Sequence, residues 1–314
     1  MGGVNRVKNI AVLFLISMLL SACLARAGTP TPEGGIIPKV LVVETFLADI
    51  AQNVAGDRLK VDSLLPIGLD PHSYEPTPQD IAKIADSQVL IVNGAGFETW
   101  LARILANAGT QSQVIEAAAG LQSRKIYEGE AADGQPREQG DPHFWLDPNN
   151  VIHYVDNIRD GLAQADPPGK NIYEKNAESY KTRLSELDAW ITTQVEQIPP
   201  ERRLLVTNHE SLGYFADRYG FKIVGTILPS VSTGASPSAQ ELAQLVDHIK
   251  ATGAPAIFLE TGSSTQLARQ VAQETGVKVV TELYSHSVTA PGGEAPTYID
   301  MMKFDVNRIV TALK

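Results

Sequence analysis

Two of the six histidines in this sequence end the same unusual tripeptide. His72 and His143 are each preceded by Asp-Pro. Proline restricts its own backbone and that of the residue before it, so each imidazole is placed on a constrained turn. Imidazole is a common ligand of zinc and related ions, and several histidines on rigid turns can bind an ion without cysteine. The repeated tripeptide therefore predicts metal binding.

Two further histidines follow predicted strands. His209 follows the apolar run Leu204–Thr207 after one residue, and His286 follows Val277–Val280 after a short loop. In open α/β sheets, ligand groups gather beyond the carboxyl ends of the strands. One ion between two lobes, with two histidines from each half of the chain, is the arrangement that this pattern predicts. The remaining histidines, His153 and His248, lie within helical patterns, and we expect them to be structural or surface residues.

The elements that must position these histidines alternate in type along the chain. Short apolar runs predict buried strands, and amphipathic stretches between them predict helices. Such alternation produces α/β folds with parallel sheets, and eight strands divided by a middle element favour two lobes. The expected strands include 40–43, 61–65, 89–92, 204–207, 223–227, 256–259 and 277–280, and the expected helices include 238–252, 264–275 and 298–313.

The middle element is one long predicted helix, Asn171–Gln197. Apolar residues recur in it every three or four positions from Tyr173 to Val195, and two prolines follow its end. At 1.5 Å per residue its length would be about 40 Å, enough to join two lobes. The periodicity alone fits a helix packed within one lobe equally well.

The N-terminal segment has the pattern of an export signal. Arg6 and Lys8 precede an apolar run from Ile10 to Leu20, which is short for a bilayer span but suits a signal-peptide core. The run leads into Leu-Ser-Ala-Cys, which resembles the lipobox of bacterial lipoproteins. That resemblance implies cleavage after residue 22 and a lipid anchor on Cys23. Cleavage near residues 25–27, as in an ordinary secreted protein, is the alternative.

The segment after this cysteine predicts a tether. Residues 23–37 are rich in glycine, proline and threonine, and we expect them to connect the lipid to the folded protein. No later segment is apolar enough to cross a membrane. We therefore expect a body that faces the periplasm or the cell exterior and meets the bilayer only through its anchor.

The overall composition excludes several classes of protein. The chain has 314 residues, a net charge of −10 and one cysteine. A single cysteine excludes an internal disulfide and a thiolate-rich metal site. The acidic balance argues against nucleic acid and against electrostatic docking on anionic lipid. Disorder is not expected, because 43% of the residues are hydrophobic and only 20% are charged.

Several segments together resemble the solute-binding lipoproteins of zinc and manganese ABC importers. The combination of Asp-Pro-His with His-x-Trp-x-Asp-Pro is specific to that family, and the likeness extends over almost all of the chain after residue 38. The segments that carry it are Gly68–Pro78, Asp141–Pro148, Thr207–Gly220, Ser230–Lys250, Ile257–Glu260 and Glu282–Val288.

The resemblance implies a fold and a function. It implies an N-terminal lobe over 38–168, a rigid linking helix over 169–198 and a C-terminal lobe over 199–314, each lobe with a four-stranded, mainly parallel sheet. It also implies a monomeric receptor, not an enzyme, that captures a metal ion and delivers it to a membrane permease. His72 and His143 would be ligands from the N-terminal lobe and His209 the first ligand from the C-terminal lobe.

The expected metal follows from the residues at two of these positions. At the third ligand position, which His209 occupies here, zinc receptors usually have histidine, whereas many manganese receptors have glutamate. The fourth position is commonly aspartate in Tyr-x-Asp-Ser, but this chain has His286 there. Four imidazoles would favour zinc over manganese, with manganese as the alternative; water in place of His286 is the other possibility. Nearby acids, Glu75, Asp147 and Glu210, are expected to orient the imidazoles.

Two features leave other readings open. Zinc receptors often have a histidine-rich acidic loop before the second ligand, but residues 124–141 contain no histidine. A zinc hydrolase is the alternative from another class, with three ligands, a water and Glu210 as base. The sequence from His209 begins like His-Glu-x-x-His, yet the final position is Gly213, so the protease motif is incomplete.

Overall fold

The computed structural model describes residues 37–108, 111–124, 140–234 and 236–314. Residues 37–314 form one compact unit. The expected signal peptide, the lipid-bearing Cys23 and nearly all of the tether lie outside the described residues, as does most of the 124–141 loop. Across the described ranges, none of the helices combines the length and the apolar character that a bilayer span requires.

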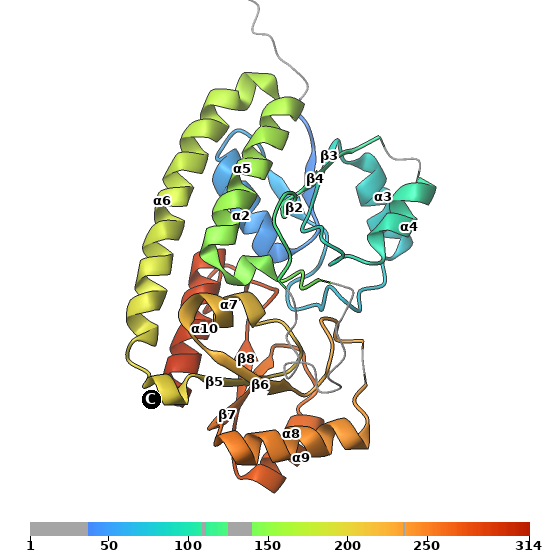
Figure 1. Cartoon of the computed structure of the whole chain (residues 1–314). Coiled ribbons are helices and arrows are strands. Elements are labelled where there is room, and N and C mark those ends of the chain that lie inside the picture. The colour runs from blue at the N-terminus through green and yellow to red at the C-terminus, as the bar shows by residue number, and fades with distance from the viewer. Residues whose placement is uncertain (1–36, 109–110, 125–139, 235) are drawn as a thin grey trace, which may run out of the picture. The chain divides into compact units, whose positions relative to one another are not determined.

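Two four-stranded parallel sheets form the frame (Figure 1). All the strand pairs in them are parallel, which confirms the expected two-lobe α/β fold. The first sheet has the order β2-β1-β3-β4, with β1 Val40–Val42, β2 Val61–Ser63, β3 Val89–Val92 and β4 Gln113–Glu116. The second has the order β6-β5-β7-β8, with β5 Leu204–Thr207, β6 Lys222–Thr226, β7 Ala256–Glu260 and β8 Lys278–Leu283.

Helices follow the strands in both sheets. Local capping defines several of them: Thr77 and Asp80 form a capping box at the start of α3, and Asp147 accepts a hydrogen bond from Asn149 N at the start of α5. The helices of the first half are α2 Thr45–Ala55, α3 Pro78–Asp86, α4 Leu101–Ala108 and α5 Pro148–Ala165. Those of the second half are α7 Gly213–Tyr219, α8 Ala239–Thr252, α9 Gln266–Thr275 and α10 Tyr298–Leu313.

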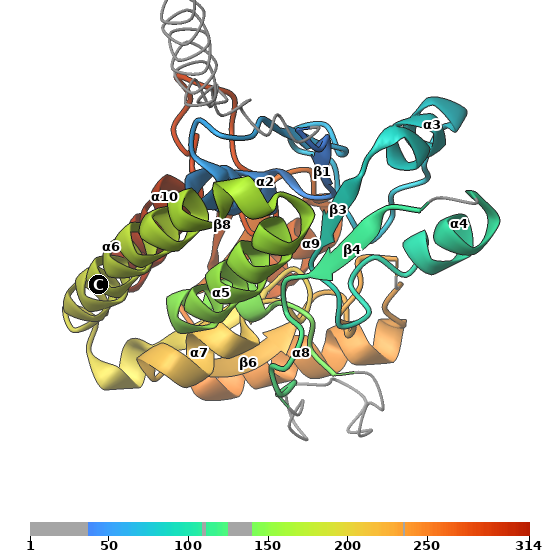
Figure 2. The same ribbon diagram turned by 90° about the horizontal axis from the view of Figure 1, so that it is seen from above.

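The long helix α6, Lys170–Val195, is shared by both halves. Its 26 residues correspond to about 39 Å. It packs against α2 and α5 of the first half and against α10 of the second, as Figures 1 and 2 show. Its buried stripe consists of Tyr173, Ala177, Tyr180, Leu184, Leu187, Ile191 and Val195. The helix therefore joins the two lobes and is not confined to one of them.

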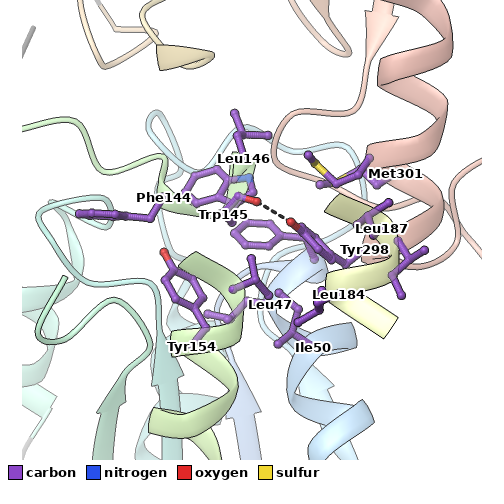
Figure 3. Packing of buried hydrophobic residues seen from close by; sticks show 14 of the residues in the cluster. Leu47, Ile50, Phe144, Trp145, Leu146, Tyr154, Leu184, Leu187, Tyr298 and Met301 are labelled. Atoms are coloured by element: carbon purple, nitrogen blue, oxygen red, sulfur yellow. Dashed lines mark hydrogen bonds between the residues drawn. The ribbon is translucent and has the colours of Figure 1, made fainter. Parts of the chain in front are cut away.

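The two lobes also share one hydrophobic core (Figure 3). Trp145, from the short 3-10 helix Phe144–Leu146, is fully buried and stacks on Phe46 of α2 with 4.5 Å between ring centroids. The Tyr298 hydroxyl, at the start of α10, donates to the Trp145 carbonyl at 2.6 Å. Because this core is continuous across both lobes, we expect only small movements of one lobe against the other.

Candidate metal centre

All four predicted ligands lie in segments that follow strands. His72 lies in the loop between β2 and α3, and His143 lies directly before the Phe144–Leu146 helix. His209 follows β5 after one residue, and His286 follows β8 after two. Because every strand pair is parallel, the segments that follow neighbouring strands in one sheet emerge at the same edge.

Three of these histidines meet at their Nε2 atoms. The His143 Nε2 atom lies 3.2 Å from His72 Nε2 and 3.2 Å from His209 Nε2. One ligand atom from each of the three lies within 4.8 Å of those of the others. In a tetrahedral zinc site with bonds of about 2.0–2.1 Å, neighbouring nitrogens are about 3.3 Å apart. The spacing therefore fits a single shared ion.

Asp141 orients the second histidine. Its Oδ1 atom accepts from the His143 backbone N at 2.9 Å and from the ring Nδ1–H at 2.8 Å. Asp70 makes the equivalent backbone bond, accepting from His72 N at 3.0 Å. Donation from Nδ1 leaves the His143 Nε2 lone pair directed into the cluster, which is the tautomer that a metal requires.

Glu260, the last residue of β7, holds the histidines of the second sheet. Its Oε2 atom lies 2.9 Å from His209 Nδ1 and 3.5 Å from His286 Nε2. Its Oε1 atom accepts from the Ser211 hydroxyl at 2.7 Å. Neither Glu260 nor Asp141 was among the acids predicted from the sequence to orient the imidazoles. The Asp-x-His spacing, which occurs twice in the sequence, indicates an orienting role for Asp141. The place of Glu260 at the end of a predicted strand indicates the same role for that residue.

The buried cluster is electrostatically suited to one added cation. Burial, together with the neighbouring histidines, lowers the pKa of His143 and of His72 well below its usual range. Burial also opposes protonation of His209, but the Glu260 carboxylate outweighs it and raises the pKa of His209. With neutral rings the Nε2 lone pairs of His143 and His209 would face each other. A proton or a metal ion between them relieves that repulsion.

His286 faces the same cluster from the second sheet. Its side chain is 4% exposed, and its ring centroid lies 6.2 Å from that of His209 and 6.4 Å from that of His72. Neither ring nitrogen has a hydrogen-bond partner among the described residues. Its nearest charged group is the Glu260 carboxylate, 3.5 Å from Nε2. A buried imidazole that makes no hydrogen bond is costly unless it binds something. It lies outside the group of three whose ligand atoms are within 4.8 Å.

The three predicted orienting acids have different surroundings. Glu75 is exposed, and Asp147 caps α5 through its bond from Asn149 N at 2.9 Å. Glu210 is buried, and its backbone N–H donates to the Ser230 carbonyl at 2.9 Å. Their orienting role stays a prediction, whereas Asp141 and Glu260 have the ring contacts that this role requires.

A glycine-rich turn supplies an aromatic wall for the site. Gly94, Ala95 and Gly96 all have positive φ, at 79°, 53° and 79°, a conformation that favours glycine. The Glu98 carboxylate fixes the turn by accepting from Asn93 N at 2.6 Å and Gly94 N at 3.1 Å. The turn places the Phe97 ring 4.7 Å from the His72 ring and 5.7 Å from the His143 ring, measured between centroids.

Comparisons with known proteins identify the family of this chain. Residues 40–312 match the family described as "ZnuA: Zinc-uptake complex component A periplasmic". The manganese-binding lipoprotein MntA of Halalkalibacterium halodurans is 36% identical over 302 residues, which cover 96% of this chain and 97% of that protein. The sequence likeness thus extends over nearly the whole length of both chains.

Solved structures show the same architecture with different metals. The manganese-bound periplasmic metal-binding protein of Candidatus Liberibacter asiaticus is 30% identical, with a TM-score of 0.78 over 88% of this chain and 100% of that one. The periplasmic zinc-binding protein TroA of Treponema pallidum is 26% identical, with a TM-score of 0.79 over 88% and 99%. Relatives of similar fold are therefore described with manganese and with zinc.

Proposed function

The chain belongs to the ZnuA family of solute-binding proteins of metal ABC importers, and on this premise we propose that it captures zinc between its lobes and delivers it to a membrane permease. As a member of that family it is a receptor and not an enzyme. One observation carries the proposal: the Nε2 atoms of His72 and His209 each lie 3.2 Å from that of His143. The ion is the cargo of this receptor.

The choice of zinc rests on the chemistry of the donor set. His72, His143, His209 and His286 would present neutral nitrogen donors, and the buried Glu260 carboxylate beside two of them supplies one negative charge. Imidazole suits zinc, whereas manganese prefers carboxylate, carbonyl and water oxygens. Manganese is the alternative, because the MntA relative is described as manganese-binding.

The cellular placement in this proposal follows the family and the N-terminal sequence. Relatives with this architecture are described as lipoproteins, and we place the lipid on Cys23 and the receptor outside the cytoplasmic membrane. The permease is the protein partner, and the receptor acts as a monomer.

The direct test is the metal content of the protein. We expect protein purified without chelators to contain zinc at one ion per chain, and excess manganese not to displace it in a competition assay. If the purified chain contains manganese and does not exchange it for zinc, the cargo is manganese and not zinc. A chain that takes up neither ion at micromolar concentration would contradict the receptor function.

Replacing His286 with aspartate is expected to shift the metal preference. The change exchanges a neutral nitrogen donor for an anionic oxygen donor, which favours manganese. We expect the ratio of zinc to manganese affinity to fall by at least about tenfold, a change of about 1.4 kcal/mol in relative binding free energy. Calorimetric titration of both ions measures it. Equal affinities in His286→Asp and the original protein would show that this residue is not a ligand.

Zinc affinity is expected to decrease as the pH falls. Zinc requires unprotonated imidazoles, and Glu260 raises the pKa of His209 above its usual value of about 6.5 in spite of burial. The proton competes with zinc below that raised pKa, so competition begins above pH 6.5. It then strengthens by about tenfold for each further pH unit. His72 and His143 add nothing there, because their pKa values are lowered. Competition titrations across this pH range measure the zinc affinity, and a constant affinity would contradict a site built of histidines.

A further inference from the structure

A pocket of mixed polar and apolar lining lies beside the proposed metal centre. It has a volume of about 300 Å³ and is lined from both lobes, by Asp70 of the N-terminal lobe and by residues of the C-terminal lobe that include Asn208, Thr233, Thr261, Ser263 and His286. Side-chain oxygen atoms come from seven of the thirteen lining residues, and five others are apolar or glycine: Ile227, Leu228, Pro237, Gly262 and Leu267. The pocket therefore combines room for a hydrated ion with weak oxygen ligands for it.

Asp70 provides the negative charge on the wall of the pocket. Its carboxylate accepts from His72 N at 3.0 Å, from the Ser73 hydroxyl at 2.9 Å and from the hydroxyl of Thr233. The Thr233 bond joins the loop that carries His72 to a loop of the C-terminal lobe. The carboxylate is thus fixed at the boundary between the lobes, two residues from a proposed ligand.

His286 connects the pocket to the metal centre. It lines the pocket, and its ring also lies 6.2 Å from the ring of His209, centroid to centroid. Only 4% of the side chain is exposed, and neither ring nitrogen makes a hydrogen bond within the described part of the chain, although Glu260 Oε2 lies 3.5 Å from Nε2. Of the four predicted ligands, His286 is the one that the pocket reaches.

We propose that this pocket is a transit site. In it the Asp70 carboxylate binds the hydrated ion first, His286 then becomes its first nitrogen ligand, and the other three histidines bind it last. The proposal rests on the metal-receptor function above and adds the path that the ion takes. The ion exchanges water for oxygen ligands in the pocket and then oxygen for nitrogen at the centre. Release follows the same path in reverse, and His286 is the last imidazole to dissociate from the ion.

A transit ligand changes rates and not the final affinity. Asp70 would attract the ion during approach and would receive it again during release, so it lowers the barrier in both directions. Asp70 lies outside the set of predicted final ligands, so its loss should slow both steps by a similar factor. A residue that only supports the fold of the loop would instead weaken the bound state and speed up release.

The test is stopped-flow measurement of zinc association and chelator-induced release with Asp70→Asn. This change removes the charge and keeps the side-chain shape. We expect both rate constants to fall about tenfold and the dissociation constant to change less than about threefold. We also expect a weaker dependence of the association rate on ionic strength. Faster release, or association rates equal to those of the original protein, would overturn the proposal.

Two controls separate the charge in the pocket from other effects. Asp247→Asn removes the same charge from an exposed site on α8, and we expect unchanged rates. Ser73→Ala removes one hydrogen bond to Asp70 and keeps its charge, and we expect rates within about twofold of the original. If Asp70→Asn behaves like the controls while the original protein binds zinc, the transit site fails and the receptor function stands. If the original protein does not bind zinc, the receptor function itself fails.

Discussion

Replacing His143 with alanine is expected to lower zinc affinity by more than about 100-fold. His143 is fully buried, and its Nε2 atom is the one that lies 3.2 Å from both His72 and His209. Loss of an outer residue that merely orients a ligand typically costs 10–100-fold in metal affinity, so loss of the central ligand should exceed that range. The measurement is competition for zinc against a chelator of known affinity.

The matched control for this experiment is His248→Ala. His248 is an exposed histidine on α8, so the substitution removes the same side chain without touching the cluster. We expect its zinc affinity to equal that of the original protein. Circular dichroism of both metal-free variants checks that they fold. Retention of full affinity by His143→Ala, or an equal loss in both variants, would contradict the proposed centre.

The positions of the four histidines beyond strand ends could be predicted because they depend on local sequence. The Asp-Pro-His turns and the strand that precedes His209 are each recognisable within a few residues, and parallel α/β sheets collect such groups at one edge. The same locality explains the prediction of α6, whose apolar repeat from Tyr173 to Val195 is regular. Its contacts with α2, α5 and α10 settle what periodicity left open, namely that both lobes share it.

The orienting acids could not be chosen from local sequence, because their contacts depend on strand order. Glu260 reaches His209 and His286 since β7 lies between β5 and β8 in the sheet. That order differs from the order of the strands along the chain. Asp147 lies in the same motif as His143, which suggested an orienting role, and in the structure its carboxylate caps α5. The acids with ring contacts, Asp141 and Glu260, were therefore found from the structure and not from their place in the sequence.

The strand β4 was missed for a related reason. Only Ile115 of its four residues is buried, so Gln113–Glu116 lacks the apolar run that marks the inner strands. It forms the edge of the first sheet beside β3, whose four residues are all buried. An edge strand with one buried residue is defined by its backbone pairing, which local composition does not reveal.

The second large effect is expected from Trp145→Ala, which should destabilise the metal-free protein by about 3–5 kcal/mol. The Trp145 ring is fully buried and stacks on Phe46 with 4.5 Å between centroids. Its indole N–H donates to the Ser285 carbonyl at 2.7 Å, a bond that alanine cannot make, whereas the backbone carbonyl of residue 145 can still accept from the Tyr298 hydroxyl. The substitution therefore removes core volume. It also removes the side-chain hydrogen bond to Ser285, which directly precedes the fourth predicted ligand, His286.

The experiment is urea unfolding in excess chelator, because bound metal would add its own stabilisation. Trp190→Ala is the matched control: Trp190 is half-buried on α6 with the Lys303 ammonium 5.8 Å from its ring centroid, so a smaller loss is expected. A loss in Trp145→Ala no larger than in Trp190→Ala would contradict the role of Trp145 in the shared core.

Trp145→Phe distinguishes the two contributions of this side chain. The smaller ring keeps much of the buried volume but has no N–H donor, so the Ser285 carbonyl loses the bond it receives. Leaving a buried acceptor without its partner costs about 1–3 kcal/mol. Ser285 directly precedes His286, so we expect Trp145→Phe to weaken zinc binding as well as stability. A variant that loses stability but keeps its zinc affinity would show that the His286 segment holds its position without this bond. The Thr45 hydroxyl contacts Ser287 at 3.1 Å and also accepts from Val288 N, so other bonds to this segment remain in that variant.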